Sequence, residues 1–114
     1  ETPNMLENFN LSVLIFQDFI KAYEEDRTYD LINPRSGKVW KNVKAKYLMD
    51  AIAMNAWKTG DPGVLFFDNI NKRNVLLKAK GNIKSTNPCG EEPLYEYESC
   101  NLGSINLYAH LKED

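Results

Sequence analysis

Two short apolar runs, with a long helix-patterned segment between them, constrain the fold of this chain most. Residues 9–16 read FNLSVLIF and residues 64–67 read VLFF. Runs of this length, rich in branched and aromatic side chains, are typical of strands buried on both faces. Residues 45–58 have only Asp50 and Asn55 as polar members of their middle part, which predicts a helix covered on most sides. Strand, helix and strand in this order predict an α/β layer architecture.

The remaining segments supply a second helix, a hairpin and several loops. Apolar residues at 16, 19, 20 and 23 predict a helix that ends near residue 26. Residues 28–32 and 38–43 flank an Asn-Pro-Arg-Ser-Gly turn, which predicts a β-hairpin insertion. Residues 68–85 are asparagine-rich and predicted as mostly loop, with a short helix at 69–73. A long structured loop over 86–99, a third strand at 102–107 and a helix start at 108–111 complete the prediction.

Composition excludes several classes of protein. At 114 residues the chain is one domain at most, and its net charge of −2 argues against a large nucleic-acid interface. No apolar run approaches the roughly 18–20 residues of a membrane span, so we expect a cytoplasmic protein with no membrane partner. Two cysteines and a single histidine, His110, are too few for a zinc site or a disulfide scaffold. Both ends of the sequence look cut from something longer.

Asn87-Pro88-Cys89-Gly90-Glu91 is the stretch that can carry chemistry. In an extended chain, residues i, i+2 and i+4 point to the same side, so an amide, a thiol and a carboxylate would project together. A turn around a buried structural cysteine is the alternative interpretation. Ordinary nucleophilic cysteine catalysis fits less well, because His110 is the only possible imidazole partner.

A resemblance to a known family favours the reactive interpretation. Residues 85–107 read STNPCGEEPLYEYESCNLGSINL, which closely resembles the active-site segment of ribonucleotide reductases, especially the adenosylcobalamin-dependent class. The segments at 8–13, 30–35 and 60–63, the last followed by VLFFD, resemble the same family in the same order. Residues 1–114 are therefore identified as a fragment of the catalytic barrel domain, with residues 85–100 as its active-site loop. Glu92 departs from the family pattern, which usually has an apolar or amide residue there.

The resemblance implies a fold and a set of roles. The fold would be part of a ten-stranded α/β barrel, with the cysteine-bearing loop threaded into its centre as a finger. Cys89 matches the cysteine whose thiyl radical abstracts the 3′-hydrogen of a ribonucleotide. Glu91 matches the general base for the 3′-hydroxyl, and Asn87 matches a residue that hydrogen-bonds the substrate. Cys100 matches one of two cysteines that supply reducing equivalents and end as a disulfide, its partner lying before Glu1.

The resemblance also implies partners and a cofactor. These are adenosylcobalamin, a ribonucleoside di- or triphosphate, a thioredoxin-like reductant and the remaining parts of the reductase. The segment alone would be inactive and would bind no cofactor, and its open strand edges predict self-association. The alternative is a non-catalytic truncated relative that acts as an interaction module. The two hypotheses differ in whether replacing Cys89 by serine abolishes nucleotide reduction in the assembled enzyme.

Overall fold

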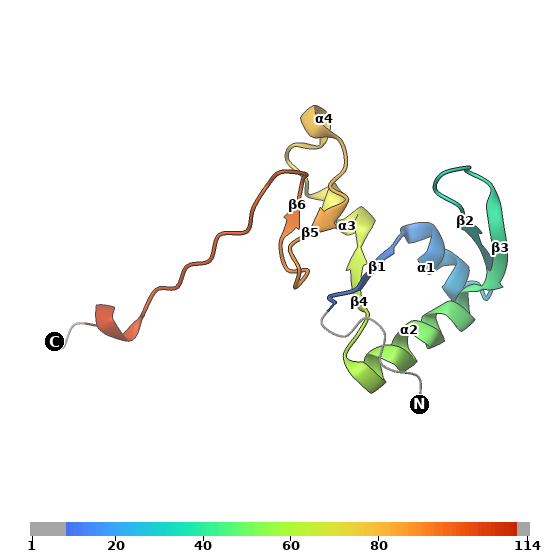
Figure 1. Cartoon of the computed structure of the whole chain (residues 1–114), viewed down its shortest axis with the longest axis horizontal. Helices are drawn as coiled ribbons and strands as arrows, with labels where there is room; N and C mark the ends of the chain where they lie inside the picture. The colour runs from blue at the N-terminus through green and yellow to red at the C-terminus, as the bar shows by residue number, and fades with distance from the viewer. Residues whose placement is uncertain (1–8, 112–114) are drawn as a thin grey trace.

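A parallel pair of strands joins the two apolar runs at the centre of the molecule. The computed structural model of the chain describes residues 9–111, and β1 (Ser12–Ile15) pairs with β4 (Gly63–Phe66) in parallel (Figure 1). Ser12 lies opposite Gly63, and Ile15 lies opposite Phe66. A Cβ at Gly63 would lie 3.2 Å from the Ser12 Oγ, tighter than an ordinary contact. Glycine at this position therefore lets the strands begin side by side.

Two helices and a hairpin connect these strands and form the core. In chain order they are α1 (Gln17–Glu24), β2 (Thr28–Ile32), β3 (Val39–Lys44) and α2 (Ala45–Thr59). The buried core consists of Ile15, Phe19, Ala22 and Ala45, so β1, α1 and the start of α2 meet there. The Tyr29 ring of β2 meets the Phe19 ring edge-on, with 5.2 Å between centroids.

Local turn chemistry explains where these elements begin and end. The Asn33 Oδ1 accepts hydrogen bonds from the backbone N–H groups of Arg35 and Ser36, at 2.9 and 3.2 Å, which closes the turn between β2 and β3. Gly60 has φ +87° and ends α2 in the left-handed conformation that glycine adopts most easily. The predicted hairpin insertion, both long helices and both strands of the parallel pair are confirmed.

The C-terminal half contains shorter elements. These are α3 (Phe67–Lys72), α4 (Leu77–Lys80), β5 (Ser85–Thr86), β6 (Pro93–Leu94) and a 3₁₀ turn, η1 (Tyr108–His110). The short helix expected near 69–73 is confirmed as α3, whereas α4 was not predicted. The third strand predicted at 102–107 is wrong: this segment runs away from the rest of the molecule without pairing (Figure 1). Its apolar side chains Leu102, Ile105 and Leu107 are largely exposed.

The predicted burial of β4 and of most of α2 is also wrong in this chain, whereas β1 ends in the buried Ile15. Val64 and Phe66 of β4 are exposed, and Tyr47 and Trp57 of α2 are 69% and 81% exposed. Apolar patterning indicates that one face of an element is buried, but it does not indicate which segment packs on that face. Within residues 9–111 no second layer packs on these faces.

The architecture is mixed α/β, as predicted, but the described residues form no closed barrel. Their strands make three separate two-stranded sheets, so there is no ten-stranded barrel and no centre into which a finger loop could insert. The radius of gyration is 18.9 Å, against roughly 13 Å for a compact chain of this length. The accessible surface is 10205 Å², against roughly 6,400 Å² for a compact domain of this mass. No helix within residues 9–111 combines the length and apolarity needed to cross a bilayer.

Candidate active site

The loop that carries Cys89 is the tip of the hairpin made by β5 and β6. Ser85 pairs with Leu94 and Thr86 with Pro93. Between the strands the chain turns sharply, because the backbone N–H of Gly90 donates to the Asn87 carbonyl at 3.1 Å. Gly90 has φ +85°, a conformation that other residues rarely adopt.

This turn corrects the predicted alternation of side chains. Asn87, Cys89 and Glu91 do not lie along an extended strand: Asn87 is 8% exposed, whereas Cys89 and Glu91 lie on the surface. The left-handed conformation of Gly90 closes the chain into a turn instead. The amide therefore points into the loop, while the thiol and the carboxylate stay accessible from outside.

The turn sits over the parallel strands. A Cβ built at Gly90 would lie 3.6 Å from the Leu65 Cδ2 of β4 and 4.0 Å from the Ser12 Oγ of β1. The cysteine loop, far along the chain from β1, is thus in contact with both central strands.

Asn87 connects several parts of the loop through polar contacts of its backbone and side chain. Its backbone N–H donates to the Glu92 carbonyl at 3.1 Å, and its Oδ1 accepts the Glu92 backbone N–H at 3.0 Å. Its Nδ2 faces the Cys100 Sγ at 3.9 Å, a weak contact with a polarisable acceptor. The structure therefore brings Asn87 and Cys100 together, as residues of one site.

Cys100 has a raised pKa because of its acidic surroundings. The first cause is a hydrogen bond with the Glu92 carboxylate, which favours the protonated thiol. Partial burial and the charges of Glu92, Glu91 and Cys89 act in the same direction. Cys89 and Cys100 are both free thiols.

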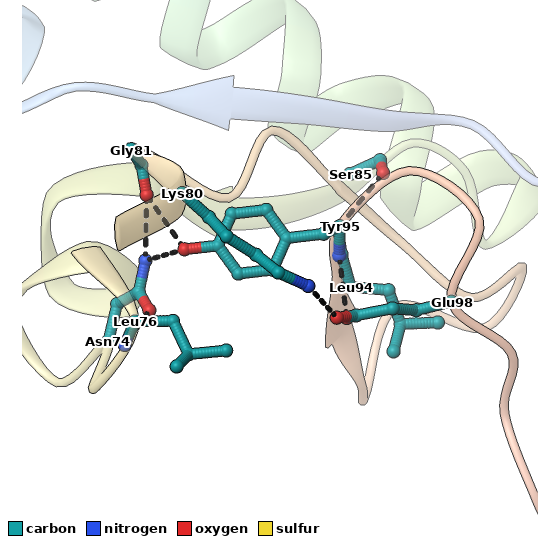
Figure 2. Close-up of polar contacts among 8 residues, drawn as sticks. All are labelled: Asn74, Leu76, Lys80, Gly81, Ser85, Leu94, Tyr95 and Glu98. Carbon is teal, nitrogen blue, oxygen red and sulfur yellow. Dashed lines mark hydrogen bonds and ion pairs between the residues drawn. The ribbon is translucent and has the colours of Figure 1, made fainter. Parts of the chain in front are cut away.

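A polar network holds Tyr95, the residue that follows β6 at the end of the hairpin (Figure 2). The Tyr95 hydroxyl donates to the Gly81 carbonyl at 2.7 Å and accepts from the Asn74 Nδ2 at 2.7 Å. The Tyr95 backbone N–H donates to the Glu98 Oε2 at 3.0 Å, and the Lys80 Nζ binds the Glu98 Oε1 at 3.0 Å. Both bonds lower the pKa of Glu98, and the bond from the Tyr95 backbone contributes most.

Asn71 binds the backbone just before β5, where the chain enters the same hairpin. This residue of α3 is 6% exposed and binds both backbone groups of Ile83. Its Oδ1 accepts the Ile83 N–H at 2.8 Å, and its Nδ2 donates to the Ile83 carbonyl at 3.1 Å. Its Oδ1 also accepts from Asn74 at 3.3 Å, so the Ile83 and Tyr95 anchors form one network.

Sequence reasoning missed this supporting network. The signal was present as the clustering of asparagines at 69, 71, 74 and 82, in a segment that was predicted as mostly loop. Buried asparagines that cap irregular backbone give the same composition. None of the described residues form a cluster of histidine, cysteine or acidic side chains that could hold a metal ion.

Comparison with known proteins shows the family of the chain. The family model described as "Ribonucleotide reductase, barrel domain" matches residues 1–114. The chain belongs to the ribonucleotide reductase barrel-domain family. It is 54% identical over 103 residues to a vitamin B12-dependent ribonucleoside-diphosphate reductase of Thermoplasma acidophilum, covering 90% of this chain. It is 50% identical over 107 residues to the protein of the same name from Mycobacterium tuberculosis H37Rv, covering 94% of this chain.

More distant reductases match nearly the whole chain as well. A vitamin B12-dependent ribonucleotide reductase of Streptomyces avermitilis is 38% identical over 113 residues, 99% of this chain. The chain spans only 13% of the Thermoplasma protein, 15% of the Mycobacterium protein and 12% of the Streptomyces protein. The 114 residues therefore correspond to a small part of a ribonucleotide reductase, and this part includes the cysteine loop.

Proposed function

We propose that this chain supplies the radical-bearing segment of a ribonucleotide reductase, which converts ribonucleotides to deoxyribonucleotides for DNA synthesis. One observation carries most weight: the loop exposes the Cys89 thiol, and the side chain of Asn87, two residues earlier, faces the Sγ of a second thiol, Cys100, at 3.9 Å. A reaction that needs one thiol for radical transfer and another for reduction requires such a pair. The collinear family match over residues 1–114 supports the same assignment.

Each loop residue then has a role. Cys89, as a thiyl radical, abstracts the 3′-hydrogen of the ribose, and Glu91 accepts the proton of the 3′-hydroxyl. Both side chains are exposed and two residues apart, so one ligand can contact both. Asn87 is assigned to hydrogen-bond the substrate on the family resemblance alone, since in this chain its amide is buried and contacts Glu92 and Cys100.

The overall reaction balances with two thiols. A ribonucleotide and two thiols give a deoxyribonucleotide, one disulfide and one water, the 2′-oxygen leaving in the water. Cys100 is one of these thiols. Since the 114 residues contain only Cys89 and Cys100, the second comes from outside this segment. A thioredoxin-like dithiol protein then restores the pair.

The relatives suggest the cofactor and the substrate. All three are named vitamin B12-dependent, and two are named for ribonucleoside diphosphates. We therefore assign adenosylcobalamin as the source of the radical and a ribonucleoside diphosphate as the substrate, in the cytoplasm. No described residue is assigned to hold the cofactor. The chain contributes an exposed thiol, which a large group bound by other segments can reach.

The exposed apolar faces fit a segment of a larger barrel. Several large apolar side chains lie almost fully on the surface, with 74–94% of each side chain exposed: Trp40, Trp57, Val75 and Leu102. Exposed apolar surface of this kind often marks a site of contact with other segments. In the complete ten-stranded barrel, other strands and helices would cover these faces and enclose the cysteine loop. An enclosed site protects a radical from solvent. Exposed apolar faces also fit the alternative, an interaction module without catalysis.

Replacing the two cysteines singly separates these functions. In the full-length protein, Cys89→Ser should abolish nucleotide reduction, with an unchanged circular dichroism spectrum. Cys100→Ser should abolish turnover with a dithiol protein but leave the first hydrogen abstraction intact. An interaction module predicts instead that Cys89→Ser has no effect in any assay of the assembled protein.

A further inference from the structure

A turn just before Cys100 sets where this cysteine lies. Residues 101–107 form neither a helix nor a strand, so in the described part of the chain the Cys100 backbone is held from its N-terminal side. On that side the backbone N–H of Glu98 donates to the Tyr95 carbonyl at 3.3 Å, which closes a turn. The direction in which the chain leaves this turn therefore decides whether the Cys100 Sγ lies 3.9 Å from the Asn87 Nδ2.

The turn requires a backbone conformation that tyrosine disfavours. Tyr97, its third residue, has φ +66°, in the left-handed region where glycine or asparagine is usual. Its side chain is fully exposed, so within residues 9–111 no packing of that side chain offsets the strain. A residue other than glycine keeps such a conformation only when its surroundings hold it there. The contacts that hold the turn must therefore come from its other residues.

The Glu98 carboxylate supplies those contacts. Its Oε2 accepts a hydrogen bond from the Tyr95 backbone N–H at 3.0 Å, which ties the last residue of the turn to the first. Its Oε1 accepts a hydrogen bond from the Lys80 Nζ of α4 at 3.0 Å. The Lys80 Nζ also lies 5.0 Å from the centre of the Tyr95 ring, and Figure 2 shows the lysine side chain crossing that ring. Glu98 therefore closes the turn and fastens it to α4.

We propose that Glu98, paired with Lys80, is a positioning residue for Cys100: its carboxylate holds the preceding turn so that the Cys100 thiol faces Asn87. The role in catalysis rests on the proposed function, in which Cys100 is one of the two thiols that reduce the substrate. Cys89 lies in a different turn, which is closed by backbone and side-chain bonds of Asn87. Loosening the turn before Cys100 should therefore slow reduction and leave hydrogen abstraction by Cys89 intact.

The test compares two activities of the full-length protein. Turnover with a dithiol reductant requires Cys100, whereas release of 3′-deuterium from a labelled ribonucleoside diphosphate requires Cys89 and not Cys100. Glu98→Ala should lower turnover on the order of tenfold, the scale of one hydrogen bond to a charged group near the surface, while deuterium release stays within about twofold of the wild type. A side chain that only stabilised the fold would lower both activities together.

Matched variants separate the ion pair from the rest of the turn. Lys80→Met removes only the ion pair, which is half-exposed, so it should lower turnover by at most about fivefold. Lys80→Arg keeps the charge and should retain turnover. Lys78→Met removes the same charge from another exposed position of α4 and should leave turnover unchanged.

A second measurement does not depend on activity. Amide hydrogen exchange in peptides covering residues 95–101 reports how firmly the turn is held in the full-length protein, and the rate of Cys100 alkylation by iodoacetamide reports its accessibility. Both rates should rise in Glu98→Ala and stay at the wild-type level in Lys78→Met. If the wild type shows neither turnover nor deuterium release, the proposed function fails, and these rates still test the hold of Glu98 on Cys100.

Three results would overturn the proposal. The first is a Glu98→Ala protein whose exchange and alkylation rates equal those of the wild type. The second is a turnover that falls only together with deuterium release, because the two cysteines would then be disturbed alike. The third is a raised exchange rate with unchanged turnover, which would leave Glu98 with no part in reduction.

Discussion

Removing the Asn71 side chain is expected to loosen the hairpin that carries Cys89. In Asn71→Ala, both backbone groups of Ile83 lose their partner, and Asn74 loses one of its acceptors. The bond to the Phe67 carbonyl is also lost, but that oxygen belongs to the first residue of α3, where the helix supplies another donor. The net loss in Asn71→Ala is therefore three hydrogen bonds.

The magnitude follows from these bonds. A neutral hydrogen bond contributes about 1 kcal/mol net, so three of them give about 3 kcal/mol for holding Ile83 and Asn74 in place. Because every 1.4 kcal/mol is about tenfold, local opening should become on the order of a hundredfold more frequent. Asn71→Asp keeps the acceptor for the Ile83 N–H and loses the donors, so its effect should be smaller.

Amide hydrogen exchange over residues 82–95 measures this opening directly. The control is Asn69→Ala, which removes the same side chain from an exposed position of the same helix. Exchange should accelerate in Asn71→Ala and stay near wild type in Asn69→Ala. Equal exchange in both variants would refute the view that Asn71 anchors the cysteine hairpin.

Three further outcomes are expected. Gly90→Ala should destabilise the loop by about 1–2 kcal/mol, since alanine is strained at positive φ; unchanged urea denaturation would contradict this. Glu98 has a lowered pKa, so its hold on Tyr95 is present above the ordinary value of 4.5 and lost as pH falls through the lower folded value. The NMR shift of the Tyr95 amide should follow this loss, and Glu98→Gln should abolish the titration. The isolated 114 residues should self-associate in sedimentation velocity, less so as Trp57→Lys, and a clean monomer at high concentration would contradict this.

Elements that depend on nearby residues were predicted well from the sequence. The Asn33 turn and the apolar face of α1 are decided within a few residues, and both are confirmed. The order of strand, helix and strand predicted the α/β architecture, and the structure adds that β1 pairs with β4 in parallel. These features need only local sterics and hydrophobic periodicity.

Features that depend on distant contacts were predicted less well. The segment 102–107 has strand composition but no partner within the described residues, so composition alone could not make it a strand. The cysteine loop was predicted as extended, yet Gly90 closes it against Leu65 and Ser12. The roles of Asn87, Cys89 and Glu91 stay predictions, because they follow from the family resemblance and not from the alternation that was assumed.

The exchange of the substrate 3′-hydrogen tests the central claim most directly. The full-length protein is incubated with adenosylcobalamin, a reductant and a ribonucleoside diphosphate that carries deuterium at the 3′ position. If Cys89 abstracts this hydrogen, the wild type and Cys100→Ser should lose part of the deuterium to solvent, and Cys89→Ser should lose none. Loss of deuterium that persists in Cys89→Ser would contradict the assignment of Cys89 as the radical-bearing residue.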